Sequence, residues 1–232
     1  GDGGSNALSV ALHPVLNDHE LAVPVIKRVR AINSAAQLCA YGLYAPLNAD
    51  LLRSLGVEFI LGGEFEAALV EVAVGNYSRS NTEAVSFPDR LPRLEFRIPD
   101  RHDLPAPSRY ASLQVGSSRR LVGYTEASRG CKHHCRHCPV VPIYKGQFRV
   151  IPLDVVLADI RKQVELGVQH VTFGDPDFFN GIGHARRIVV ALAREFPKLT
   201  YDVTIKIEHL LRHADDFERL RETGCLFVTS AV

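Results

Sequence analysis

Residues 126–142 read EASRGCKHHCRHCPVVP, and this stretch decides how the whole chain is interpreted. It places three cysteines and three histidines within the eight positions 131–138. Cysteine thiolates and histidine imidazoles are the side chains that hold zinc ions and iron–sulfur clusters in proteins. The stretch therefore predicts a metal centre on a short loop.

Two metal centres fit the spacing Cys131-x3-Cys135-x2-Cys138. A structural zinc ion needs four ligands, so it would take the three cysteines and one histidine of the same loop. A [4Fe–4S] cluster can be held by three thiolates, which leaves one iron free to bind a substrate or cofactor. Structural zinc usually draws its ligands from two spaced pairs, whereas these cysteines form one dense run. The spacing therefore favours the cluster.

The composition indicates a globular protein without a bias towards nucleic acid or membrane. The chain has 232 residues, a formal net charge of +1 and 46% hydrophobic residues. Basic and acidic residues are balanced along it, so no polyanion-binding surface is predicted. The sequence has no apolar run long enough to span a bilayer and no signal segment at its start.

The cysteine content favours a reducing compartment, and we expect a cytoplasmic location. The five cysteines are odd in number and three are clustered, which is unlike a secreted disulfide framework. Cys39 and Cys225 lie in predicted strands and are expected to be small buried residues. The chain contains no methionine and stops inside the apolar run 224–232, so both ends are interpreted as boundaries within a longer protein.

The N-terminal part alternates strands and helices after a turn-rich start, 1–20, that predicts no element. Apolar residues at helical spacing predict helices over 21–32, 48–56 and 64–74, and short apolar runs predict strands over 36–42 and 57–63. Asn48 and Gly56 are expected to cap the middle helix. This alternation predicts a parallel sheet covered by helices.

A second alternating part follows a proline-rich polar segment, 77–118, that is expected to be an extended linker. Its predicted strands are 120–127, 168–173, 201–207 and 225–232, and its predicted helices are 152–167, 183–196 and 214–224. Four strands joined by helices predict half or more of a β/α barrel, or an open doubly wound sheet. Both folds place their chemistry at the carboxyl ends of the strands.

Polar residues follow each of these four strands. In chain order they are the loop 131–138, residues 174–177 (GDPD), Lys206 with Glu208 and His209, and Thr229 with Ser230. The four sets are expected to converge on one mouth, because the carboxyl ends of parallel strands share one edge of the sheet. Such convergence favours an enzyme over a loop stapled by zinc.

The motif SRGC…C…C after a first barrel strand resembles that of the radical S-adenosylmethionine (SAM) superfamily, and the resemblance covers 120–232. It implies that Cys131, Cys135 and Cys138 hold a [4Fe–4S] cluster whose open iron binds SAM. An electron from a donor such as flavodoxin or ferredoxin would then cleave SAM to methionine and a 5′-deoxyadenosyl radical. That radical takes hydrogen from a substrate, a small molecule or peptide that the sequence does not identify.

The resemblance also implies which residues contact SAM. FGDPD (173–177) stands at the glycine-rich stretch after the second strand, whose backbone meets the SAM amino group in that family. His137 occupies a place where an aromatic residue is usual. The implied SAM-binding residues are His137, Gly174, Asp175, Pro176, Asp177, Glu208 and Ser230. No catalytic residue is assigned.

Several of these polar residues have a structural interpretation as well. Glu208 could form a salt bridge with Lys206 or Arg212, and the two aspartates could form a turn around Pro176. The remaining histidines could be structural: His133 and His134 would cover the cysteine loop, and His209 would support its strand end.

The N-terminal half resembles the cobalamin-binding domain that precedes many radical SAM barrels. A Rossmann-like unit ending in ILGGEFEAALVEV, followed by a proline-rich segment, carries this resemblance. Together with GYTEASRGCKHHCRHCPVVP, the stretch 38–66 is similar to the CUAEP/CCAEP-tail radical SAM proteins. The implied cobalamin-binding residues are Tyr41, Gly42, Leu43, Gly62, Gly63 and Glu64, with the nucleotide tail against the three glycines. The first strand and loop of this unit are expected to be missing, and no D-x-H-x-x-G motif supplies a histidine for cobalt.

We therefore expect an α/β chain with three parts. They are a truncated Rossmann-like cobalamin-type domain (1–76), a linker (77–118) and the first four βα units of a partial TIM-type radical SAM barrel (119–232). The expected function is radical SAM chemistry, by methyl transfer or radical rearrangement, with cobalamin as an optional further cofactor. The rival is a non-catalytic zinc-binding interaction module.

Overall fold

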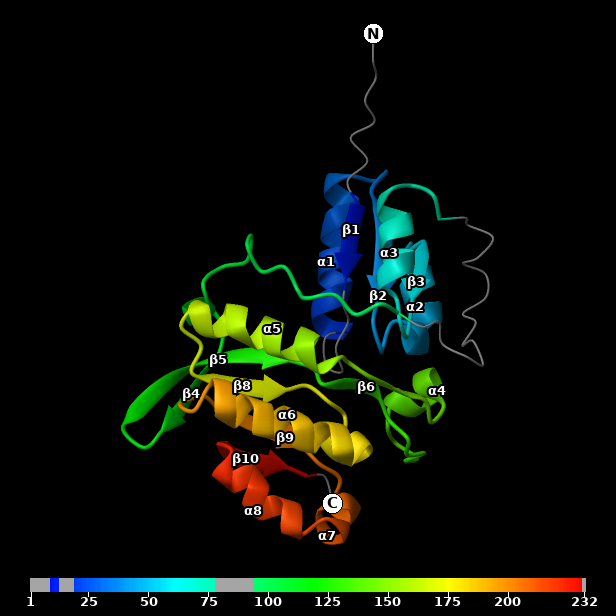
Figure 1. Ribbon diagram of the computed structural model, residues 1–232. Coiled ribbons are helices and arrows are strands. Elements are labelled where there is room, and N and C mark those ends of the chain that lie inside the picture. The colour runs from blue at the N-terminus through cyan, green and yellow to red at the C-terminus, as the bar shows by residue number, and fades with distance from the viewer. Residues whose placement is uncertain (1–8, 13–18, 78–93, 231–232) are drawn as a thin grey trace. The chain divides into compact units, whose positions relative to one another are not determined.

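The computed structural model describes residues 9–12, 19–77 and 94–230 of the chain (Figure 1). It divides into two compact units, which are described separately below. The first unit contains Gly1–Leu94 together with Cys135–Lys145, and the second contains Glu95–His134 together with Gly146–Val232. The described helices are all too short or too polar to serve as a membrane span.

A three-stranded parallel sheet in the order β1-β2-β3 forms the centre of the first unit. Its strands are β1 (Ser9–Leu12), β2 (Gln37–Tyr41) and β3 (Phe59–Leu61). Its helical segments are α1 (His19–Ile32), η1 (Pro46–Asn48), α2 (Ala49–Ser54), α3 (Glu66–Ala73) and α4 (Val140–Tyr144).

Alternate residues of β2 pack on opposite faces of this sheet, as the period of a strand requires. Leu38 and Ala40 pack in one cluster with Ile26 of α1 and Leu52 of α2. Cys39 packs in another cluster with residues of β3 and α3. The sheet is therefore covered on both faces, which is the arrangement that the strand–helix alternation predicts.

The structure corrects two expectations about the N-terminal part. The expectation of a missing first strand was wrong, because Ser9–Leu12 forms β1 and pairs in parallel with β2. These four residues are too few to show a strand pattern of their own, and the sequence around them is rich in turns. Their pairing with β2 is what identifies them as a strand. The Asn48 side chain does not cap α2; it donates a hydrogen bond to the Tyr44 carbonyl at 2.9 Å. Gly56 follows α2 with a φ of +82°, as expected of a residue after a helix end.

A five-stranded sheet in the order β10-β9-β8-β5-β4 forms the centre of the second unit. Its strands are β4 (Ser112–Val115), β5 (Ser118–Thr125), β8 (His170–Phe173), β9 (Thr200–Thr204) and β10 (Cys225–Thr229). The pairs β5–β8, β8–β9 and β9–β10 are parallel, and β4 pairs antiparallel with β5. A small antiparallel pair, β6 (Ser128–Gly130) with β7 (Phe148–Val150), joins the two ends of the cysteine loop.

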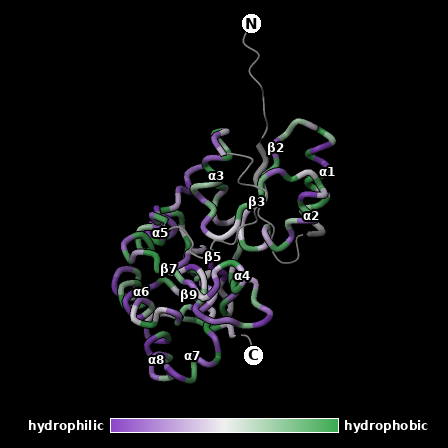
Figure 2. Tube along the Cα trace, turned by 90° about the vertical axis from the view of Figure 1, so that its right-hand side faces the viewer, coloured by the Kyte–Doolittle hydropathy of each residue, from purple (hydrophilic) through white to green (hydrophobic). Residues whose placement is uncertain are grey.

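The helices of the second unit run alongside the strands that they connect (Figure 1). They are α5 (Leu153–Glu165), α6 (Ile182–Glu195), α7 (Ile207–Arg212) and α8 (Asp215–Glu222), with short turns η3 (Pro107–Arg109) and η4 (Phe178–Gly181). Ile160 of α5 and Ile188 of α6 are fully buried in one core with Val171 and Val203. Figure 2 shows the mixed polar and apolar colouring of α5 and α6, as expected of helices with one buried face.

Polar residues alternate with these core residues along the strands. On β8 and β9, His170 and Thr172 both contact the Asp202 carboxylate, at 2.8 and 2.7 Å. A polar inner face and an apolar, helix-covered outer face are expected of the curled sheet of a partial β/α barrel.

Two further expectations are corrected in the second unit. Ser112–Val115 lies within the predicted linker but forms β4 of the sheet; residues 78–93 of that linker lie outside the described residues. The run 225–232 was expected to be a buried strand, yet Leu226 and Phe227 are 40% and 44% exposed. They are exposed because β10 is an edge strand of this sheet, paired with β9 alone.

Candidate metal and cofactor site

The three clustered cysteines follow β6 on a loop at the carboxyl end of β5. All five cysteines of the chain are free. Cys131 is buried, Cys138 is half-buried and Cys135 is exposed. The unit boundary falls inside the loop, so Cys131 is described with the second unit and the other two with the first.

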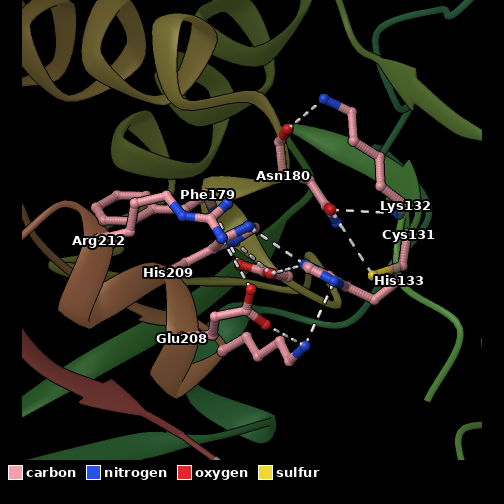
Figure 3. Close-up of polar contacts among 10 residues, drawn as sticks. Cys131, Lys132, His133, Phe179, Asn180, Glu208, His209 and Arg212 are labelled. Atoms are coloured by element: carbon pink, nitrogen blue, oxygen red, sulfur yellow. Dashed lines mark hydrogen bonds and ion pairs between the residues drawn. The ribbon is translucent and has the colours of Figure 1, made fainter.

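Asn180 of η4 anchors the first cysteine (Figure 3). Its side-chain oxygen lies 3.7 Å from Cys131 Sγ and accepts a hydrogen bond from the Lys132 backbone N–H at 3.2 Å. The Lys132 ammonium in turn donates to the Asn180 carbonyl at 2.8 Å. Sequence reasoning missed Asn180, although its place shortly after the second strand of the sheet puts it at the mouth.

The third cysteine starts a turn that leads into α4. Its backbone N–H donates to the Cys135 carbonyl at 3.3 Å, and its own carbonyl accepts from Val141 at 3.2 Å. Burial raises the pKa of the Tyr44 hydroxyl, and negative charge on Cys138 raises it further. Tyr44 belongs to the loop after β2, so this loop and the third cysteine are neighbours within the first unit.

The GDPD loop after β8 is fixed to the corner between β5 and β6. The Gly174 N–H donates to the Thr125 carbonyl at 2.8 Å, and a Cβ at Gly174 would lie 1.7 Å from the Tyr124 hydroxyl. The buried Asp175 carboxylate accepts hydrogen bonds from the Ala127 N–H at 2.8 Å and the Ser128 hydroxyl at 2.5 Å. Burial raises the Asp175 pKa to about 7, although these hydrogen bonds oppose the shift.

Asp177 lies close to two histidines from distant parts of the chain, His133 and His209. Its Oδ1 accepts a hydrogen bond from the Phe179 N–H at 3.1 Å and so caps η4. Its Oδ2 lies 2.8 Å from His209 Nδ1 and 3.5 Å from His133 Nε2. The Nε2 atoms of the two histidines are 3.3 Å apart. Burial lowers the pKa of the His133 imidazole, and the charges of Lys206 and His209 lower it further.

Glu208 forms both of the salt bridges considered from the sequence. It contacts Lys206 Nζ at 2.8 Å and Arg212 Nη2 at 2.9 Å, and the Lys206 ammonium lowers its pKa. Ser230 Oγ is buried and has no hydrogen-bond partner among the described residues. His137 is exposed on the part of the cysteine loop that belongs to the first unit.

The structure thus brings three of the four polar sets together in the second unit. Cys131 contacts Asn180, just after the GDPD loop, and His133 contacts both Asp177 and His209. None of these contacts involves Thr229 or Ser230. The pairing of His133 with His209 could not be read from the sequence, because it depends on the direction of two side chains that are 76 positions apart.

The residues implied for cobalamin follow β2 and β3 in the first unit. The Gly42 N–H donates to the Leu61 carbonyl at 3.0 Å, so the two strand ends are adjacent. Gly42 and Gly63 have positive φ angles of 101° and 64°. Beyond them, the ring of Tyr41 lies 4.8 Å from that of Phe65, Glu64 is buried and Leu43 is half-buried.

The proline ring of Pro46 lies beside Gly62. A Cβ at Gly62 would lie 2.3 Å from Pro46 Cγ, so a proline ring fills the space beside it. An added side chain would therefore meet Pro46, while contact of a nucleotide tail with the exposed Gly62 backbone stays a prediction.

Comparison with known proteins identifies the class of this site. Residues 125–231 match the profile of the radical SAM superfamily. The ribosomal protein uS12 methylthiotransferase RimO of Cronobacter sakazakii is 25% identical over 152 residues, covering 60% of this chain and 34% of that protein. The tRNA-2-methylthio-N(6)-dimethylallyladenosine synthase of Chlorobium chlorochromatii is 32% identical over 63 residues, or 27% and 14% of the two chains. The similarity to the radical SAM superfamily therefore lies in residues 125–231.

Two solved structures share the fold over 97% of this chain. The radical S-adenosylmethionine methyltransferase TsrM of Kitasatospora setae, with cobalamin and a [4Fe–4S] cluster bound, aligns with a TM-score of 0.69 and 17% identity. The cobalamin-dependent S-adenosylmethionine radical enzyme OxsB aligns with a TM-score of 0.60 and 14% identity. This chain spans 48% and 35% of those two chains, and about a third of the RimO protein.

Proposed function

We propose that this chain forms the first part of a radical SAM enzyme in which Cys131, Cys135 and Cys138 hold a [4Fe–4S] cluster. The observation that carries the proposal is the loop of three free cysteines at the carboxyl end of β5, inside a radical SAM domain. Three thiolates without a fourth protein ligand suit a cluster with one open iron. Asn180 supports the proposal because it orients the first cysteine and its neighbour.

The proposed SAM site lies along the loop 174–177. In this superfamily the cluster supplies the electron that cleaves SAM. The chain's contribution is to bind and orient the cofactor with backbone groups that the fold holds still. The Asp175 carboxylate serves this purpose, since it ties the loop to Ala127 and Ser128 at the base of the cysteine loop. His137, Glu208 and Ser230 remain predicted SAM contacts.

The zinc-binding alternative is less well supported. It needs His133, His134 or His137 as fourth ligand; His133 instead faces Asp177 and His209, while His137 is exposed. The ring of His134 lies against Gly146, where an added Cβ would be 2.6 Å from Nε2. The superfamily match over 125–231 also favours an enzyme.

Cobalamin is proposed as a further cofactor of the N-terminal unit. The likeness to two cobalamin-containing structures over nearly the whole chain supports it. The ends of β2 and β3 are adjacent and carry Gly42 and Gly63, whose positive φ angles favour glycine, next to the exposed Gly62. The loop after β2 and Cys138 belong to the same unit, and the charge of Cys138 raises the pKa of Tyr44 on that loop.

The finer assignments stay predictions. They are membership of the CUAEP/CCAEP-tail subgroup, a Rossmann-type cobalamin domain, a small-molecule or peptide substrate, flavodoxin or ferredoxin as electron donor, and a cytoplasmic location. The named relatives include methyltransferases and methylthiotransferases, so methyl transfer is favoured over rearrangement.

The test is to purify the protein without oxygen and measure iron, sulfide and zinc per chain. We expect a brown protein that cleaves SAM to 5′-deoxyadenosine or transfers its methyl group when reduced. Alanine at Cys131, Cys135 or Cys138 should abolish iron binding and SAM turnover together. Cys225→Ala and Cys39→Ala are matched controls that should keep the cluster. A colourless protein with one tightly bound zinc would instead establish the zinc module.

A further inference from the structure

We propose that His133, Asp177 and His209 form a second metal site, which holds a divalent transition-metal ion such as zinc or iron(II). The three residues come from the cysteine loop, the end of β8 and helix α7, and all belong to the second unit. Each offers one ligand atom, and these atoms lie within 4.8 Å of one another. None of them is a proposed ligand of the iron–sulfur cluster.

The two distances from the Asp177 carboxylate are close to those between ligand atoms of a single ion. Zinc binds imidazole nitrogen and carboxylate oxygen at about 2.0–2.2 Å, so ligand atoms around one ion are about 3.0–3.5 Å apart. Asp177 Oδ2 lies 2.8 Å from His209 Nδ1 and 3.5 Å from His133 Nε2. Two imidazoles and one carboxylate are a ligand set that proteins use for zinc and for non-haem iron(II).

Unsatisfied buried atoms give an independent indication of a ligand. Asp177 Oδ2 and His209 Nδ1 are both buried, and neither has a hydrogen-bond partner among the described residues. They lie 2.8 Å apart, within ion-pair distance, but without hydrogen-bond geometry. Buried polar atoms without a hydrogen bond are unfavourable, and one cation bound by both would satisfy them.

The carboxylate is also held in place for this role. Asp177 is 2% exposed, and its other oxygen is fixed by the Phe179 N–H at 3.1 Å. A hydrogen bond to the second oxygen of a ligating carboxylate orients the first, as is usual around protein metal sites. Asp177 then contributes its backbone rather than its carboxylate to the proposed SAM site.

The competing arrangement is a network without metal. In it, the Lys206 ammonium, 3.4 Å from His133 Nδ1, donates a hydrogen bond to that nitrogen, and His133 Nε2–H faces Asp177. With a metal, three protein ligands leave positions open on the ion, as in catalytic rather than structural sites. The open positions would take water or an oxygen or nitrogen atom of the substrate.

Zinc binding to the cluster-loaded protein tests the proposal. Protein with measured full iron and sulfide content, so that its cysteines are occupied, is dialysed against zinc and its bound zinc counted. We expect one zinc per chain in the wild type. Asp177→Asn and His209→Ala should weaken zinc binding by on the order of a hundredfold or more, since they remove atoms that bind the ion directly. Zinc should raise the Tm of the wild type but not of these variants.

His134→Ala is the matched control, because His134 is an exposed histidine of the same loop. It should bind zinc as the wild type does. Cluster-loaded wild type that holds no more zinc than His209→Ala would overturn the proposal. Iron and sulfide in the same samples report on the cluster independently. A variant with serine at all three clustered cysteines should still bind zinc in a His209-dependent manner, even if no cluster forms.

Discussion

At the end of β3, the space beside the Gly62 backbone is occupied by the ring of Pro46. An added Cβ would approach Pro46 Cγ to 2.3 Å, and a proline ring cannot rotate away. We predict that Gly62→Ala lowers the free energy of unfolding by about 1–3 kcal/mol, as overpacking typically does. Denaturant unfolding of the cofactor-free protein measures this change.

Pro46→Ala removes the colliding atom and serves as the second arm of a double-mutant cycle. The double variant should be less destabilised than the sum of the two single variants. Simple additivity would show that a side chain at Gly62 does not conflict with Pro46.

The buried carboxyl of Asp175 gives the fold a dependence on pH. Its pKa is raised from 3.8 to about 7 by burial, so the folded state favours the protonated form. The contribution of Asp175 to stability is therefore fully present below pH 3.8 and is lost as the pH rises through about 7. Within this window, each unit of rising pH lowers the free energy of unfolding by up to about 1.4 kcal/mol.

Asp175→Asn keeps the shape of the side chain but cannot ionise. We predict that the difference in stability between wild type and Asp175→Asn shifts in favour of the variant between pH 5 and pH 8. Unfolding titrations at the two pH values measure it, and the subtraction removes other titrating groups. An unchanged difference would mean that the Asp175 carboxylate is ionised in the fold throughout.

Among the elements, the segment after the first unit holds the sheet to its helix rather than merely connecting domains. Arg101, inside the predicted linker, donates hydrogen bonds to the Tyr124 carbonyl of β5 at 3.1 Å and to the buried Asp159 of α5 at 2.9 Å. We predict that Arg101→Leu destabilises the protein by about 1.5–3 kcal/mol, the range for hydrogen bonds to charged groups.

The loss of stability in Arg101→Leu stays in this range because Asp159 keeps hydrogen bonds from Thr125 and Gln163. Arg97→Leu is the matched control, since Arg97 is exposed on the same segment. Thermal unfolding compares the two variants. Equal Tm values would show that this segment is a passive connection.

The same elements show how far the sequence predicts this fold. Long amphipathic patterns located α5 and α6, because buried residues such as Ile160 and Ile188 recur at helical spacing. The strands β1 and β4 were missed, because each has four residues and is defined by pairing with a distant or adjacent partner rather than by its own pattern. The rule that the carboxyl ends of parallel strands share one edge correctly predicted that the polar residues near Cys131 and Asp177 lie close together. It could not foresee that Asn180 or the pair His133–His209 would make the contacts, since these depend on side-chain direction.

For the whole molecule, the central question is whether the N-terminal unit binds cobalamin. Its loop after β2 carries Leu43, which is half-buried, and Tyr44, whose pKa is raised by the charge of Cys138. The expected cobalamin contacts from this loop do not involve the space that Pro46 fills. A bulky side chain at Leu43 should therefore block cobalamin without the backbone strain that a change at Gly42 or Gly63 would cause.

The last prediction uses the full-length protein that contains this chain, reconstituted with hydroxocobalamin and with iron and sulfide. We expect the wild type to retain both cobalt and iron after desalting, and Leu43→Trp to retain iron but lose most of its cobalt. Leu51→Trp is the matched control, because Leu51 is 43% exposed on α2 of the same unit, and it should retain both metals. Because the two cofactors are counted separately, loss of cobalt alone reports on the N-terminal unit. Wild type with iron but no cobalt would make this unit a scaffold and remove the cobalamin-dependent branch of the proposed function.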